Sequence, residues 1–445
     1  MFVTHHIPQA NSLGTLKHFL KTRMAQKLSR VTRDIWVLSL ATFINRATGF
    51  LGLFAAVFFN EIKLDAQAVV LALLIVGIAG VSGSLVGGHL ADRIGKLPVL
   101  LGSTLINIVI FTALALADYT LGWWTVTLAA LNVFVSQSFV GPASALVAAS
   151  ATGRERVSRF AFYRIFINVG SIVAPALVGV IGREHFNLLF WFSVAGSALV
   201  PFILYWGIRG ATTGGGNTSG TSELSEPRES SPAADNLRNK PSAYLSSMWD
   251  TLALPFVYIA MAFTMVVYAQ HQSAVPLRLD SEPNGVQLYS FLLIINPVIV
   301  IFFEYPLSHL TKRLPSYLAL CFGIFVMGFG VALAGICAQL PAVVIVGWVL
   351  FSVGECLFAP MSHTYVAELS SEAAQSRSQS YLATVQSIGY ALGPGIGSWM
   401  LLVLAAGAWG GFMILTLAAV GLVLCARLSE PRESGANHAN ERDKS

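Results

Sequence analysis

Charged residues are scarce in this chain. Asp, Glu, Lys and Arg together make up 11% of its 445 residues, whereas a soluble globular domain carries about 25%. Hydrophobic residues make up 55%, and the mean hydropathy is +0.67. So little charge argues against an ordinary water-soluble domain and predicts an integral membrane protein.

The sequence motifs of common enzymes are also missing. The chain has no Walker lysine motif, which argues against an ATP-driven pump, and it has neither an HExxH nor a GxSxG element. Its four cysteines form no CxxC pair and lie inside hydrophobic runs, as buried free thiols do. We therefore expect no enzymatic activity, no metal site and no cofactor.

What the chain does have is a series of hydrophobic runs of about 20 residues, each long enough to cross a membrane core of about 30 Å. We expect them near 35–59, 67–91, 98–117, 122–150, 160–182, 187–208, 251–271, 287–308, 317–338, 341–367, 379–404 and 408–427. No signal-peptide pattern precedes the first run, so it is expected to remain as an anchor. The predicted fold class is an all-α membrane protein with twelve transmembrane helices.

The basic residues are distributed unevenly between the two sides of these spans. Of the 27 Lys and Arg residues, 22 lie in the N-terminal segment, the even-numbered loops or the C-terminal tail. The positive-inside rule then puts both termini in the cytoplasm of an integral plasma (inner) membrane protein. The formal net charge of +5 follows from these positions and needs no nucleic-acid partner.

One stretch without hydrophobic runs divides the spans into two groups of six. It contains Thr212–Gly220, whose Thr, Gly, Asn and Ser composition is typical of a flexible linker. The predicted parts are a cytoplasmic basic N-terminus (1–33), an N-terminal six-helix bundle (34–208), a flexible cytoplasmic linker (209–248), a C-terminal six-helix bundle (249–427) and a cytoplasmic tail (428–445).

The two groups of spans carry a weak internal repeat. Three motif pairs recur in order at an offset of 218 or 219 residues: Gln137-x4-Pro142 with Glu355-x4-Pro360, Arg159-x3-Tyr163 with Arg377-x3-Tyr381, and Gly170-x4-Pro175 with Gly389-x4-Pro394. Ordered matches at nearly one offset indicate two pseudo-repeated six-helix bundles. Such halves predict a binding site at their interface near the membrane midplane, about which they rock.

Four Arg or Glu residues lie well inside the runs, where a charge at mid-membrane costs about 2.5–3.5 kcal/mol on insertion scales. Arg46 and Glu355 lie near the midplane. One interpretation is a structural ion pair or a hydrogen-bonded brace between helices. The other is that both face a central cavity, where burial favours the neutral form of Glu355 and makes it a proton site. Arg46 would then bind an anionic group or change the proton affinity of Glu355.

The other two charges lie closer to the cytoplasmic edge. Arg164 can extend its guanidinium to the membrane surface or pair with Asp92. Glu304 lies eight residues before Lys312 and is either a proton site or a gate residue.

Uncharged polar side chains at similar depth add candidates. They are Asn45, Gln137, Asn168, Tyr268, Gln270, Asn296, His363, Gln386 and Tyr390. We expect most of them to form hydrogen bonds between helices and a minority to contact substrate. His363 lies near the inner end of its run, which favours a solvated or capping role.

The turn between the second and third runs carries the order G-x-x-x-D-R-x-G-K over residues 88–96. This order, after the second of about twelve runs, resembles the loop 2–3 signature of the major facilitator superfamily of transporters. Gly95 permits the sharp turn, and Asp92 can face the positive N-terminus of another helix. The resemblance implies a cytoplasmic gate formed by Gly88, Asp92, Arg93, Gly95 and Lys96, with a latch against helix 11.

Residues 35–427 resemble the drug:proton antiporter branch of this superfamily. That branch has a Gly-Pro element in helix 5, which here runs from Gly170 to Pro175 with Ala174 in place of the usual Gly. The branch often has an Arg in helix 4 linked to proton coupling; the fourth run has none, and Arg164 early in the fifth takes a related place. The resemblance implies a monomer that moves a small molecule and protons across the lipid bilayer.

Three functions are compatible with these features. The first is proton-coupled export of a hydrophobic or amphipathic small molecule by alternating access. The alternative is uptake of one specific metabolite by proton symport, with Arg46 guiding an anionic one. A non-transporting receptor or scaffold is disfavoured, because the linker and tail are short and carry no recognisable domain.

Overall fold

The computed structural model describes residues 33–117, 122–150, 153–182, 185–213, 253–311, 314–370 and 374–429. Within these ranges the chain forms α-helices and short 3-10 segments, and no strand. Eleven segments there are long and apolar enough to cross a membrane, and the last of them, Arg377–Ser429, contains two helices. The predicted all-α fold with twelve spans is therefore confirmed.

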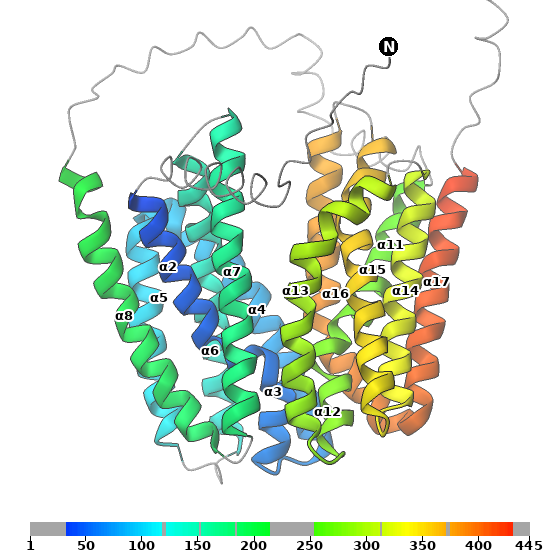
Figure 1. The fold of residues 1–445 in the computed structure, drawn as a ribbon, viewed down its shortest axis with the longest axis horizontal. Helices are drawn as coiled ribbons and strands as arrows, with labels where there is room; N and C mark the ends of the chain where they lie inside the picture. The colour runs from blue at the N-terminus through cyan, green and yellow to red at the C-terminus, as the bar shows by residue number, and fades with distance from the viewer. Residues whose placement is uncertain are drawn as a thin grey trace, which may run out of the picture.

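The N-terminal half is the blue-to-green part of Figure 1. Its helices are α2 (Arg33–Thr48), α3 (Phe50–Glu61), α4 (Ala66–Ile94), α5 (Lys96–Ala115), α6 (Gly122–Ala149), α7 (Gly153–Ile181) and α8 (Phe186–Thr213). Helices α2 and α3 form one span that is interrupted at Gly49, where the backbone leaves helical geometry. Gly95 separates α4 from α5 with a φ of +95°, a conformation that glycine adopts without a steric penalty.

The C-terminal half, lime to red in Figure 1, has the same order of spans. Its elements are α11 (Ala253–Tyr268), η2 (Ala269–Gln272), α12 (Ala274–Asp280), α13 (Gly285–Thr311), α14 (Ser316–Ile336), α15 (Pro341–Glu368), α16 (Gln375–Leu404), η3 (Ala405–Gly407) and α17 (Ala408–Ser429). Helices α11 and α12 form one span broken by the 3-10 segment η2. The first span of each half is thus interrupted.

Several helices extend beyond the predicted hydrophobic runs. Helix α8 continues to Thr213, past the predicted start of the linker at residue 209, and α7 begins at Gly153 rather than at residue 160. A helix satisfies its backbone hydrogen bonds internally whether its side chains face lipid or water. It can therefore continue past the hydrophobic run at either end, and hydropathy alone makes the predicted helix too short. The rest of the predicted linker, the basic N-terminus before residue 33 and the tail after residue 429 lie outside the described residues.

The internal repeat is visible in the helix packing. A Cβ atom at Gly170 of α7 would lie 2.7 Å from the Phe43 carbonyl oxygen and 2.9 Å from the Arg46 Cβ of α2. A Cβ atom at Gly389 of α16 would meet the Ala262 oxygen of α11 at the same 2.7 Å and the Met265 Cβ at 2.9 Å. Each glycine lets the fifth helix of its half approach the first, and Arg46 and Met265 occupy equivalent positions.

The two halves lie close together at one end of the bundle and diverge towards the other (Figure 1). We name the end where α2 begins and α17 ends the terminal face, and the other end the closed face. At the closed face one hydrophobic core contains residues of both halves, among them Phe54 and Phe58 of α3 and Val286 of α13. Towards the terminal face each half has a separate core of its own. The molecule is therefore closed at one end and divided at the other.

Polar contacts add to the seal at the closed face. The Asn60 side-chain amide of α3 donates a hydrogen bond of 2.6 Å to the Asp280 carboxylate of α12. The Tyr289 hydroxyl of α13 lies 3.0 Å from the Leu53 carbonyl oxygen and 2.8 Å from that of His271. Since one hydroxyl proton is shared between a carbonyl of each half, Tyr289 joins the halves directly.

Candidate functional site

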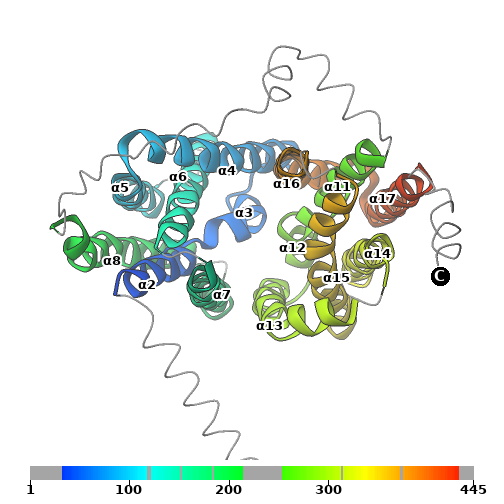
Figure 2. The same ribbon diagram turned by 90° about the horizontal axis from the view of Figure 1, so that it is seen from above.

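A cavity lies between the two halves and has two adjoining compartments. The polar compartment, of about 420 Å³, is enclosed mainly by α2, α6 and α7 on one side and α11, η2, α13 and α15 on the other. The apolar compartment, of about 690 Å³, lies between α4 and α16. Figure 2, seen along the bundle, shows α4 beside α16 and α7 facing α13. Seven residues line both compartments, so a single ligand can occupy the two together.

The compartments differ in chemistry. Thirteen of the 23 residues that line the polar compartment have polar or charged side chains. The apolar compartment is lined largely by Gly, Ala, Val, Leu, Ile and Pro, and Arg46 is its one charged lining residue within the described ranges. Such a mostly apolar cavity with a few polar groups that fix orientation suits a small organic molecule.

Glu355 faces the polar compartment from α15. The Tyr268 hydroxyl donates a hydrogen bond of 2.8 Å to its Oε1 atom, and the Asn296 amide donates one of 2.7 Å to its Oε2 atom. Asn296 also donates to the Ser352 hydroxyl at 3.1 Å. The carboxyl group of Glu355 is thereby held between α11 and α13, as in the hydrogen-bonded brace that we considered from the sequence.

Arg46 lines both compartments from α2. Its Nε atom is buried and has no hydrogen-bond partner. Its ionisable neighbours are Tyr163 and Tyr390, and no described residue forms an ion pair with it. The considered ion pair between Arg46 and Glu355 is absent from the described part of the chain, where the two side chains line the cavity from different halves.

Arg164 and Glu304 form an ion pair across the halves, with 3.1 Å between Nη2 and Oε2. In this conformation Arg164 therefore pairs with Glu304 and not with Asp92, the partner that we considered from the sequence. The reason is the packing of α7 against α13, which brings together residues 140 positions apart in the sequence. The two side chains are 60% and 33% exposed, so solvent weakens their attraction.

Most of the uncharged candidates lie at the cavity. Asn45, Gln137, Asn168, Tyr268 and Asn296 line the polar compartment, and Tyr390 lines the apolar one. Three candidates do not lie there and instead bind protein groups: Gln270, His363 and Gln386.

Gln270 is fully buried against α16. Its amide donates hydrogen bonds to the carbonyl oxygens of Val266 at 2.5 Å and Gly393 at 3.0 Å. At the terminal end of α15 and α16, the Nδ1 atom of His363 lies 2.8 Å from the Gln379 Oε1 atom. The bonds to Gly393 and Gln379 connect helices, whereas the six other uncharged candidates line the cavity.

Sequence reasoning missed five polar residues that line the polar compartment: Asn132, Ser136, Ser171, His271 and Gln272. The last two lie in η2. The Nδ1 atom of His271 lies 2.7 Å from the Tyr268 carbonyl oxygen, so Nδ1 carries a proton and donates. Its Nε2 atom can then accept from the Gln272 amide at 3.0 Å, which corresponds to a neutral ring. Gln272 also donates to the Tyr390 hydroxyl at 2.5 Å. For His271 and Gln272, the signal was present as three consecutive polar residues, 270–272, at the end of a hydrophobic run.

The residues of the predicted gate lie at the terminal face. Asp92, Arg93 and Gly95 are exposed, and Lys96 is partly exposed. Among the described residues Asp92 makes no hydrogen bond or ion pair, and a Cβ atom at Gly88 would meet nothing within 4 Å. The eleventh span, against which the latch was predicted, is helix α16. The latch is not formed in this conformation, in which the terminal face is open.

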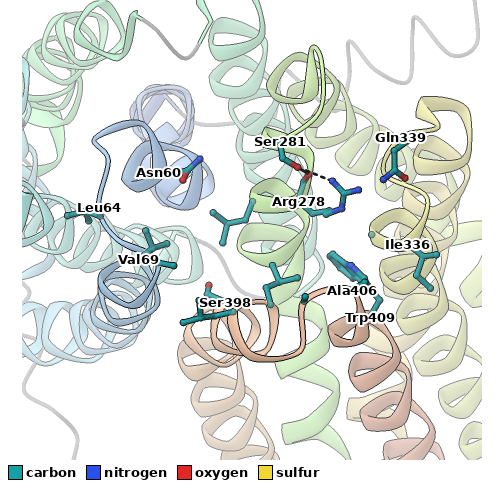
Figure 3. A pocket seen from close by; sticks show the side chains of 16 residues that line it. Asn60, Leu64, Val69, Arg278, Ser281, Ile336, Gln339, Ser398, Ala406 and Trp409 are labelled. Carbon is teal, nitrogen blue, oxygen red and sulfur yellow. Dashed lines mark hydrogen bonds between the residues drawn. The ribbon is translucent and has the colours of Figure 1, made fainter.

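A further cavity of about 570 Å³ lies at the closed face (Figure 3). Its lining comes from both halves, with Asn60 and Leu64 on one side and Ile336 and Trp409 on the other. Arg278 points into it but is held by Ser281 at 2.9 Å and by Glu282 at 2.6 Å. None of the predicted site residues lines this cavity, so it is separate from the central one.

Comparisons with known proteins agree with this geometry. The sequence model of the family described as Major Facilitator Superfamily matches residues 35–282 and 273–445. Two relatives from Bacillus subtilis (strain 168) are uncharacterized MFS-type transporters. YqjV is 23% identical over 81% of this chain and 85% of its own length. YttB is 24% identical over 73% of this chain and 77% of its own.

Solved structures share the fold. The peptide transporter POT in complex with sulfate has a TM-score of 0.68 at 16% identity and covers 96% of both chains. The nucleoside transporter NupG has a TM-score of 0.64 at 16% identity and covers 90% of this chain and 100% of its own. At this level of identity the likeness extends to the fold alone.

Proposed function

Because this chain belongs to the Major Facilitator Superfamily and is a membrane transporter of that type, we propose that it exports an amphipathic small molecule in exchange for protons. The observation that carries the proposal is the position of Glu355 in a cavity between the two halves. This carboxyl group is the one acidic side chain that lines either compartment within the described residues.

Glu355 is suited to bind and release a proton during transport. Its two oxygens accept hydrogen bonds from Tyr268 and Asn296, which stabilise the ionised form. The Tyr268 hydroxyl can rotate to accept a hydrogen bond, so the same site also accommodates the protonated form. An ionisable residue that faces a cavity inside the membrane is a functional candidate by default, because its burial is costly.

The basic residues give the transport cycle its orientation. With both termini in the cytoplasm, the open terminal face is the cytoplasmic one, and this conformation is open to the inside. Opening to the outside would separate Asn60 from Asp280 and Tyr289 from Leu53. It would also bring the terminal part of α4 towards α16, where the exposed side chains of Ser84 and Thr384 now face the cavity.

Helices α4 and α16 provide a pivot for this movement. A Cβ atom at Gly77 of α4 would collide with the backbone of Ala391 of α16. A Cβ atom at Gly395 would likewise lie 2.9 Å from the Leu74 Cβ. This close contact between the two helices would allow the halves to rock about it without separating. The latch at Asp92 would close in the opposite conformation.

The experiment compares dye efflux from an efflux-deficient bacterial host that expresses the wild type, Glu355→Gln or Glu368→Gln. Glu368 is the matched control, because it lies on the same helix but is exposed and binds Ser316. We expect the wild type and Glu368→Gln to lower dye retention in a manner that a protonophore abolishes. Glu355→Gln should retain dye as the empty host does. Equal efflux by Glu355→Gln and the wild type would refute the role of Glu355.

Uptake by proton symport is the second candidate, and the polar compartment favours it. Its many amide side chains could select one polar metabolite rather than a range of apolar ones. Symport predicts that a labelled solute accumulates in cells when the outside is acidified, whereas the proposed antiport predicts that the cells lose it.

A further inference from the structure

We propose that the transported molecule is an amphipathic organic anion, whose carboxylate binds Arg46 and whose apolar part lies between α4 and α16. This inference rests on the proposed function and narrows its substrate class. It starts from the juxtaposition of one unpartnered cation with an otherwise uncharged apolar compartment.

Arg46 lacks an anionic partner within the described residues. Its buried Nε atom has no hydrogen bond. Its electrostatic neighbours Tyr163 and Tyr390 are uncharged near pH 7. The side chain as a whole is only partly buried and its guanidinium lines the cavity, so a ligand carboxylate there could form charge-assisted hydrogen bonds with it and supply the anion that the protein does not.

The internal repeat indicates that the charge is not needed for helix packing. Gly170 packs against the Cβ atom of Arg46, and Gly389 packs against that of Met265 at the same distance of 2.9 Å. The C-terminal half therefore builds the same contact between its first and fifth helices with an uncharged side chain. What Arg46 adds to this position is a positive charge directed at the cavity.

The position of Arg46 fits a ligand with two chemically different ends. It lines both compartments, as do Gln137 and Gln272. A ligand body in the apolar compartment would meet Leu73, Val76 and other apolar side chains, with Arg46 as the one charge at its end. Such a site favours an anionic end group over a cationic one.

Glu355 does not compete for this role. Its two oxygens accept hydrogen bonds from Tyr268 and Asn296, which hold the carboxyl group on the side of the C-terminal half. The two charges that face the cavity thus have separate tasks: Arg46 binds the substrate anion from the N-terminal half, and Glu355 carries the proton in the C-terminal half.

The test measures equilibrium binding of 1-naphthylacetate and of 1-naphthylacetamide, its neutral isostere, to the purified full chain in lipid nanodiscs at pH 7.5. The wild type should bind the carboxylate at least about tenfold more tightly than the amide, a factor that corresponds to about 1.4 kcal/mol. Arg46→Met introduces the side chain that Met265 has at the equivalent position of the C-terminal half. This variant should lose the preference for the carboxylate while still binding the amide. Arg46→Lys should keep part of the preference.

Equal affinity of the wild type for the two probes would overturn the inference, and this comparison requires no variant to fold. The same preference in Arg46→Met as in the wild type would also overturn it. Binding is measured without a proton gradient, so its outcome is independent of the dye-efflux test. If the wild type shows no carboxylate preference but its efflux is intact and protonophore-sensitive, the inference alone is refuted. If the wild type prefers the carboxylate but its efflux is insensitive to the protonophore, the proton coupling alone is refuted.

Discussion

The seal at the closed face gives the sharpest prediction, which concerns Tyr289→Phe. This substitution removes the hydroxyl that lies between the Leu53 and His271 carbonyl oxygens but keeps the ring. The ring continues to pack against Phe54, with 5.1 Å between centroids. The change therefore removes a polar link between the halves and leaves the apolar part of the seal in place.

The expected magnitude follows from the number of bonds lost. The single hydroxyl proton makes one hydrogen bond at a time, and a neutral hydrogen bond contributes about 0.5–1.5 kcal/mol to the state that forms it. Only the conformation with the closed face sealed offers the Leu53 carbonyl oxygen, whereas the His271 carbonyl oxygen belongs to the same half as Tyr289 and remains available when that face opens. The ratio of closed to open molecules at that face should thus fall by up to about 13-fold, the limit set by one full hydrogen bond at RT of about 0.59 kcal/mol.

The assay is a distance distribution between spin labels at Gln67 and Gln287, which are exposed at the closed face on the two halves. The labels are attached to introduced cysteines in a background without native cysteines. Tyr258→Phe is the matched control, because the Tyr258 hydroxyl donates to the Ser378 carbonyl oxygen at 3.2 Å within the C-terminal half. We expect Tyr289→Phe to increase the population of long distances and Tyr258→Phe to leave it unchanged. Identical distributions for Tyr289→Phe and the wild type would refute the reasoning.

Three further predictions concern stability, measured as thermal unfolding in detergent. Gly95→Ala should destabilise the protein by about 1–3 kcal/mol because alanine rarely adopts the φ of +95°. Gly102→Ala, at a position with open space, should be neutral or stabilising. Arg164→Gln and Glu304→Gln should each cost at most about 1 kcal/mol, and the double variant should cost no more than either, because solvent reaches both side chains and weakens their ion pair. Gln270→Leu should cost about 1–3 kcal/mol through its lost hydrogen bonds without changing which substrates are transported; an altered substrate range with unchanged stability would contradict the structural role.

The sequence alone was sufficient for the features that depend on local composition. Apolar runs of membrane length predicted the spans, since a chain in lipid must satisfy its backbone polar groups as helices. The positions of Arg46 and Glu355 in mid-span singled them out because buried charges are rare there. Their separate environments could not be deduced, because that requires the rotation of each helix about its axis.

The contacts between distant residues were beyond sequence reasoning. Arg164 pairs with Glu304 because α7 packs against α13, and no local pattern predicts that neighbour. Gln270 and Gln272 show the same limit within one short segment. They are two positions apart in η2, yet one binds the backbone of α16 and the other lines the cavity. The change from α-helical to 3-10 geometry resets the direction of each side chain.

The central claim is that the two halves pivot about one cavity, closing one face as the other opens. The most direct measurement follows two label pairs in the same preparation, His89 with Gln375 at the terminal face and Gln67 with Gln287 at the closed face. On a change of pH across the range of transport, the account predicts opposite shifts in the two distance distributions, and no shift in Glu355→Gln. Distances that remain fixed, or that lengthen together at both faces, would contradict it.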